Sequence, residues 1–125
     1  MKVDLIIPVY KPDDKFDKLL KEIKNQTVQP NHIYIMNTEE KYFHSENISL
    51  FSNITISHIS KQDFDHGGTR NAGARQSDET VELLLFMTQD AVPADEYMIA
   101  NLVKAFSDDE VAAAYARQLA DRKVN

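Results

Sequence analysis

The sequence of 125 residues contains no cysteine, only three glycines and no long hydrophobic run. The lack of cysteine excludes disulfide bonds, thiolate nucleophiles and thiolate metal sites. No apolar run approaches the roughly 20 residues that a membrane helix needs, and Pro8 interrupts the first apolar run too early for a signal peptide. We therefore expect no membrane insertion by this chain, and a location in the cytoplasm or, through a longer protein, at the inner face of a membrane.

Basic residues are also scarce, with 14 Lys and Arg against 20 Asp and Glu and a formal net charge of −6. Because proteins that bind nucleic acid usually present a basic face, this balance argues against a nucleic-acid partner. The four histidines are scattered and form neither a His-x3-His nor an HExxH pattern. Hydrophobic residues make up 42% of the chain, which is enough for the core of one domain.

Apolar residues follow two different periods along the chain. Short apolar runs predict strands at 3–9, 32–36, 54–59 and 81–87, the third at a sheet edge, with a candidate at 111–115 whose alanines also allow a helix. Stripes with helical spacing predict helices at 13–25 and 95–106, and a further helix is expected over 70–77 with Thr69 as N-cap. Residues 39–52 show no clear period and predict an irregular connection or a short helix. This alternation predicts an α/β domain whose mostly parallel sheet is flanked by helices.

Residues that core packing does not explain follow the ends of the predicted strands. In open α/β sheets, ligands bind outside the carboxyl ends of the strands. Gly67 and Gly68 allow backbone N–H groups to approach an anion, and Arg70 offers a planar fork for a phosphate, although a simple capped turn also explains the pair. The phosphate-binding patterns GxxxxGK[ST] and GxGxxG are absent, which disfavours NTPases and dinucleotide dehydrogenases.

Asp90 follows a very apolar run and has two interpretations. It is either a solvated turn residue or an oxygen ligand for Mg²⁺ or Mn²⁺, ions that bridge diphosphates. Tyr10 is equally open, because its ring serves for packing or for stacking on a ligand. Asp63 and Asp65 suit a solvated acidic loop, and a lone loop histidine such as His66 more often has no chemical role.

Three segments together resemble a known family. Leu5 to Tyr10, which reads LIIPVY, is similar to the IPVYN opening of inverting GT-A glycosyltransferases of family 2. The segment 66–74, HGGTRNAGA, resembles their loop and helix before the metal-binding strand, and 86–93, FMTQDAVP, resembles their DxD segment. Arg117-Gln118 is similar to the rhamnosyltransferase-like subgroup.

The resemblance implies that residues 1–125 form a single sugar-nucleotide-binding domain, the Rossmann-like half of a GT-A fold, truncated at its C-terminal end. It implies transfer of a sugar, rhamnose included, from a UDP or dTDP donor to an acceptor hydroxyl with inversion, within cell-wall polysaccharide synthesis. Asp90 would hold the cofactor, Mg²⁺ or Mn²⁺. The nucleotide-sugar-binding residues would be Pro8, Val9, Tyr10, Asn37, Asp63, Gly68, Arg70, Asn71, Gln89 and Asp90.

The sequence departs from the family pattern at two places. Asn37 stands where the family often has an aspartate that recognises the base, and Thr88 replaces the first acid of DxD. We expect the catalytic base, and the region that binds a saccharide or lipid-linked acceptor, beyond residue 125, so that the chain alone is inactive. The alternatives are a non-catalytic nucleotide-sugar-binding module and a receiver-type signalling domain, which would need an acid cluster where this chain has Pro8-Val9-Tyr10.

Overall fold

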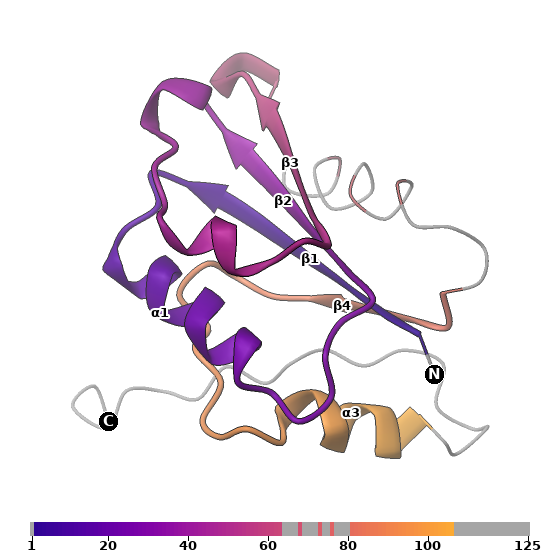
Figure 1. The fold of residues 1–125 in the computed structure, drawn as a ribbon. Coiled ribbons are helices and arrows are strands. Elements are labelled where there is room, and N and C mark those ends of the chain that lie inside the picture. Colours follow the sequence, from indigo (N-terminus) through magenta and orange to yellow (C-terminus); the bar gives the residue numbers. More distant parts are fainter. Residues whose placement is uncertain (1, 64–67, 69–72, 74–75, 77–80, 107–125) are drawn as a thin grey trace, which may run out of the picture.

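A sheet of four parallel strands forms the centre of the computed structural model, which describes residues 2–63, 68, 73, 76 and 81–106 (Figure 1). The strands are β1 (Val3–Tyr10), β2 (His32–Thr38), β3 (Ile54–Ile59) and β4 (Leu83–Phe86). Their order is β3-β2-β1-β4, and all three pairings are parallel. The predicted α/β class, the parallel sheet and the edge position of β3 are confirmed, whereas the candidate strand at 111–115 lies outside the described residues.

Helix α1 (Asp14–Lys24) forms where the apolar stripe predicts it. Asp13 is its N-cap, and the Oδ1 atom of Asp13 accepts hydrogen bonds from the backbone N–H groups of Lys15 at 3.1 Å and Phe16 at 3.3 Å. The stripe is fully buried against the sheet and consists of Phe16, Leu19, Leu20 and Ile23. Burial of one helix face therefore fixes α1 on this side of the sheet.

Helix α3 (Met98–Phe106) covers the same face, and its Ile99 belongs to the same core cluster as the α1 stripe. This helix begins three residues later than predicted. The buried side chain of Gln26 joins the two helices: its Nε2 donates to the carbonyl oxygen of Asp95 at 2.7 Å, and its Oε1 accepts from the N–H of Ile99 at 3.1 Å. The N–H groups in the first turn of a helix have no acceptor within that helix. The side chain of Gln26 supplies one for the N–H of Ile99.

Between β3 and β4 the structure describes three separate residues, Gly68, Gly73 and Gln76, and all three are helical. A Cβ atom on Gly73 would lie 2.6 Å from Cγ2 of Ile6 and 3.3 Å from Cγ of Met36, so Gly73 packs directly on β1 and β2. Gly73 and Gln76 agree with the helix predicted over 70–77, whose other residues lie outside the described part of the chain. The prediction that Gly68 precedes the helix is wrong, because Gly68 is itself helical; the proposed N-cap Thr69 lies outside the described residues.

Pro8 lies in the last part of β1, which ends at Tyr10, one residue beyond the predicted 3–9. Even-numbered residues of β1 bond toward β4, as the bond from the N–H of Met87 to the carbonyl oxygen of Ile6 shows. Pro8 has no N–H to donate to β4, and the β1–β4 pairing ends at Ile6 and Phe86. The pairing of β1 with β2 uses the odd-numbered residues and continues to Tyr10, which explains why β1 is longer, and β4 shorter, than predicted.

The connection after β2 is irregular, as expected, and contains the 3-10 helices η1 (Glu40–Tyr42) and η2 (Asn47–Leu50). The side chains of Ser45 and Asn47 bind Asp17 of α1, Ser45 Oγ to Asp17 Oδ1 at 2.5 Å and Asn47 Nδ2 to the Asp17 carbonyl at 2.7 Å. These bonds hold the connection over α1. Within the described part of the chain, no helix combines the length and the apolar character needed to cross a membrane.

Candidate functional site

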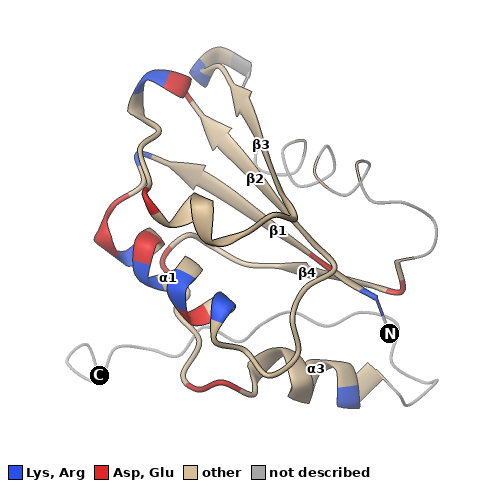
Figure 2. Ribbon diagram, viewed as in Figure 1, with Lys and Arg blue, Asp and Glu red and all other residues tan. Residues whose placement is uncertain are grey.

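The carboxyl ends of all four strands lie at one edge of the sheet, because every strand pairing is parallel. The strand order reverses at β1, since β2 and β3 lie on one side of it and β4 on the other. Open α/β sheets bind ligands at such a switch point. Figure 2 shows that charged residues follow the ends of β1, β2 and β3, while the strands themselves carry few charges.

Tyr10 and Gln89, two residues predicted for the site, come into contact across the switch point. The N–H of Tyr10 donates to Oε1 of Gln89 at 2.6 Å. This donor would otherwise have no strand partner, because β4 has already ended. Gln89 therefore bridges the diverging ends of β1 and β4. Val9, also predicted for the site, packs in the core cluster instead.

Tyr10 is 37% exposed, and cationic side chains surround its ring. The ring of Tyr42 meets it edge-on at a centroid distance of 6.4 Å. Lys11 Nζ lies 5.3 Å from the Tyr10 centroid and 4.7 Å from that of Tyr42, and Lys61 Nζ lies 5.8 Å from the Tyr10 centroid. An exposed aromatic ring beside ammonium groups suits a flat, negatively charged ligand.

Lys41 extends this cation group and remains charged at neutral pH. Its Nζ lies 4.9 Å from the Tyr42 centroid and 3.5 Å from Oε2 of Glu39. The Tyr42 hydroxyl, and then the Glu39 carboxylate, raise the pKa of Lys41 above its ordinary value. Both interactions favour the ammonium form.

Asn37 at the end of β2 is completely buried, and only half of its amide is satisfied. Its Nδ2 donates to the carbonyl oxygen of Glu39 at 3.2 Å and lies 3.0 Å from Nδ1 of His58 on β3. Within the described residues, Oδ1 of Asn37 and Oγ1 of the neighbouring Thr38 are buried without a hydrogen-bond partner. Such atoms are rare in folded proteins because they are costly, and they occur at binding sites.

Two residues with left-handed backbone conformations stand directly after the central strands. Lys11 follows β1 with φ 48°, and Glu39 follows β2 with φ 64°. Neither is glycine, so each conformation carries a cost that the surroundings must sustain. The two turns lie beside Tyr10 and Asn37, the predicted site residues at the ends of β1 and β2.

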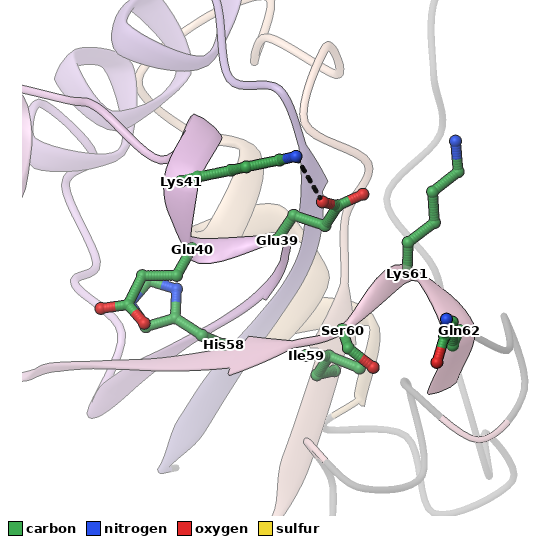
Figure 3. A pocket seen from close by; sticks show the side chains of 8 residues that line it. All are labelled: Glu39, Glu40, Lys41, His58, Ile59, Ser60, Lys61 and Gln62. Atoms are coloured by element: carbon green, nitrogen blue, oxygen red, sulfur yellow. Dashed lines mark ion pairs between the residues drawn. The ribbon is translucent and has the colours of Figure 1, made fainter.

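An open hollow of about 900 Å³ lies beside the ends of β2 and β3 (Figure 3). The exposed ring of His58 and the side chains of Lys41 and Lys61 line it together with Glu39, Glu40, Ile59, Ser60 and Gln62. Sequence reasoning did not find this group. The residues that line the hollow come together because the register of β2 and β3 places His58 opposite Asn37.

Asp90 lies exposed in the turn after β4, where Oδ1 accepts a hydrogen bond from Thr88 Oγ1 at 3.0 Å. The described residues contain no cluster of three or more His, Cys, Asp or Glu that could hold a metal ion. One exposed carboxylate fits an Mg²⁺ or Mn²⁺ ion only if phosphate oxygens and water supply the other ligands.

The remaining predicted residues are placed only in part. Gly68 is exposed, and Asp63 ends the 3-10 helix η3 (Lys61–Asp63) after β3. Arg70 and Asn71 lie outside the described residues, as do His66 and Gly67. The expected convergence of the paired glycines with Asp90 therefore stays a prediction.

Solved structures show the same fold. Staphylococcus aureus TarS residues 1–349 superpose with a TM-score of 0.61 at 19% identity, over 87% of this chain and 33% of that chain. The structure of the same TarS segment in complex with UDP-GlcNAc gives a TM-score of 0.60 at 18% identity, over 87% of this chain and 32% of that chain. The fold is thus α/β of the GT-A type.

Curated relatives match over nearly all of this chain. The O-antigen chain rhamnosyltransferase RfbN of Salmonella typhimurium strain LT2 is 38% identical over 100% of this chain and 40% of its own length. The O-antigen chain rhamnosyltransferase WbaN of Salmonella anatum is 30% identical over 97% of this chain and 38% of its own length. The chain thus spans about two fifths of these relatives. Since the profile of Glycosyl transferase family 2 also matches residues 4–125, the chain belongs to that family.

Proposed function

We propose that this chain binds a nucleoside-diphosphate sugar of the UDP or dTDP type as the donor-binding part of a glycosyltransferase. The observation that carries the proposal is the group gathered at the carboxyl edge of the sheet: the exposed ring of Tyr10, the half-satisfied amide of Asn37 and the exposed carboxylate of Asp90. A stacking ring, a buried polar contact and a cation ligand match the base and the diphosphate of such a donor.

The names of the relatives support a sugar donor and point to the process that the donor serves. Two of them are named O-antigen chain rhamnosyltransferases, and TarS has been solved with UDP-GlcNAc and with UDP. We propose that the chain serves the synthesis of a cell-surface polysaccharide, with rhamnose as the candidate sugar.

The proposed reaction is an inverting transfer. The acceptor hydroxyl oxygen bonds to the anomeric carbon from the face opposite the diphosphate, the bond between that carbon and the diphosphate breaks, and the hydroxyl proton passes to a general base. A divalent ion on Asp90 would supply electrostatic stabilisation of the departing diphosphate. The relatives are much longer than this chain, which supports our expectation that the acceptor site and the base lie in residues beyond 125.

Calorimetry with UDP and dTDP, each with and without Mn²⁺, tests the donor site. We expect binding that Mn²⁺ strengthens in the parent protein, and binding of similar strength with and without Mn²⁺ in Asp90→Asn. Glu82→Gln is the matched control, because Glu82 is an exposed carboxylate that precedes β4, at the edge of the sheet opposite Asp90. The absence of heat at millimolar nucleotide and metal, with Asp90→Asn equal to the parent, would refute the proposal.

A further inference from the structure

We propose that His58 donates a hydrogen bond through Nε2 to a carbonyl oxygen of the donor's base, and so favours uracil and thymine over adenine. The proposal rests on the proposed function and adds a specificity residue on β3, three strands away from Asp90. Asn37 and Glu39 determine which nitrogen of His58 carries the proton.

The hydrogen-bond chain begins at the backbone of Glu39. A carbonyl oxygen can only accept, so the Asn37 atom 3.2 Å from it must be the amide nitrogen Nδ2 and not Oδ1. The same Nδ2 lies 3.0 Å from Nδ1 of His58. Because Nδ2 is a donor, Nδ1 must accept, and a neutral imidazole that accepts at Nδ1 carries its proton at Nε2.

The side chain of His58 belongs to the wall of the hollow. His58 is exposed and lines the hollow with Lys41 and Lys61 (Figure 3). Phe43 packs edge-on against its ring, with the centroids 5.6 Å apart, which restrains the orientation of the ring. Among the contacts of the described residues, no hydrogen bond engages Nε2, so this donor is available to a ligand.

The position in the sheet indicates which part of the ligand His58 meets. Strands β3 and β4 are three strand spacings apart in the sheet. At about 4.8 Å per spacing, the His58 end and the Asp90 end of the site are about 14 Å apart. A diphosphate near Asp90 therefore places the other end of an extended nucleotide, its base, toward β2 and β3. Uracil and thymine present carbonyl oxygens on their outer edge, whereas adenine has none.

The tautomer can be tested without any ligand. Long-range proton–nitrogen NMR correlations distinguish a ring protonated at Nε2 from one protonated at Nδ1, and the His58 signals are assigned by their loss in His58→Asn. We expect the Nε2–H tautomer at neutral pH. A proton on Nδ1 would overturn the proposal, because Asn37 could not then donate to that atom.

Three substitutions separate the contact with the ligand from the support of Asn37. Asparagine places an amide near Nδ1, which can keep the bond to Asn37, but has no group at the Nε2 position. Glutamine places an amide donor near Nε2, and phenylalanine keeps only the ring. We expect His58→Asn and His58→Phe to weaken UDP binding about five- to tenfold, the usual effect of one lost hydrogen bond. His58→Gln should recover part of the loss.

Comparison of ligands identifies the atom that His58 contacts. We expect His58→Phe to weaken uridine and UDP by the same factor and to leave ADP unchanged. A loss confined to UDP would assign His58 to the phosphates and overturn the base contact. If the parent binds UDP and His58→Phe binds it equally well, this inference alone fails; if the parent binds neither UDP nor dTDP, the proposed function fails as well.

Discussion

Gly73→Ala should destabilise the protein, although alanine is the better helix former. Gly73 is helical and buried, and a Cβ atom there would lie 2.6 Å from Cγ2 of Ile6 and 3.3 Å from Cγ of Met36. Alanine gains about 1 kcal/mol in helix propensity. The first contact, however, is far below a normal carbon–carbon distance, and Ile6 is fully buried on the central strand. Overpacking costs about 1–3 kcal/mol, and a contact this short puts the cost in the upper half of that range, so we expect a net loss of about 1–2 kcal/mol.

Urea unfolding measures this loss, and a double-mutant cycle tests its cause. Ile6→Leu removes the Cγ2 atom while keeping the volume, so Gly73→Ala should cost less in that background. Gly68→Ala is the control, since Gly68 is helical but exposed and alanine there should be neutral or stabilising. If Gly73→Ala proved as stable as the parent, or lost the same stability with leucine at position 6, the close packing of Gly73 on Ile6 would be refuted.

Two further changes test other parts of the structure. Gln26→Leu should lower the free energy of unfolding by about 1–3 kcal/mol, because it leaves the buried N–H of Ile99 without its acceptor; an unchanged urea midpoint would contradict this role. Tyr42→Phe should lower the pKa of Lys41, followed by NMR of its side chain, since the Tyr42 hydroxyl is the largest cause of the raised value. Because the folded pKa is raised, any stabilisation from this lysine is present at neutral pH and is lost only as the pH rises through that value, so a loss near pH 7 would argue against the assignment.

The elements that were predicted well are those whose signals are local. Strand β3 has its predicted bounds, and α1 differs only at its caps, because alternation, helical spacing and the Asp13 cap are properties of neighbouring residues. The start of α3 was misplaced. Its first turn depends on Gln26, more than 70 residues earlier in the chain.

In the candidate site too, features with a local sequence signal could be predicted, and contacts between distant residues could not. Tyr10, Asn37 and Asp90 could be predicted as site residues because each lies at the end of an apolar run. The bridge from Tyr10 to Gln89 and the pairing of Asn37 with His58 were not found, because they depend on strand order and register. A single histidine near the end of a strand gives no sign of its neighbour across the sheet.

Pro8 connects the fold to the site. Its missing N–H ends the bonding of β1 to β4 and leaves the bonding to β2 intact, so only the switch-point side of β1 lacks a partner beyond Phe86. Tyr10 is the next residue of β1 that bonds toward that side, and the side chain of Gln89 serves as its acceptor. The residues after β4, Asp90 among them, are thereby freed from the sheet at the place where parallel α/β proteins bind ligands. A proline in a central strand is normally unfavourable. Here it ends the pairing of β1 with β4 at the point where the candidate site begins.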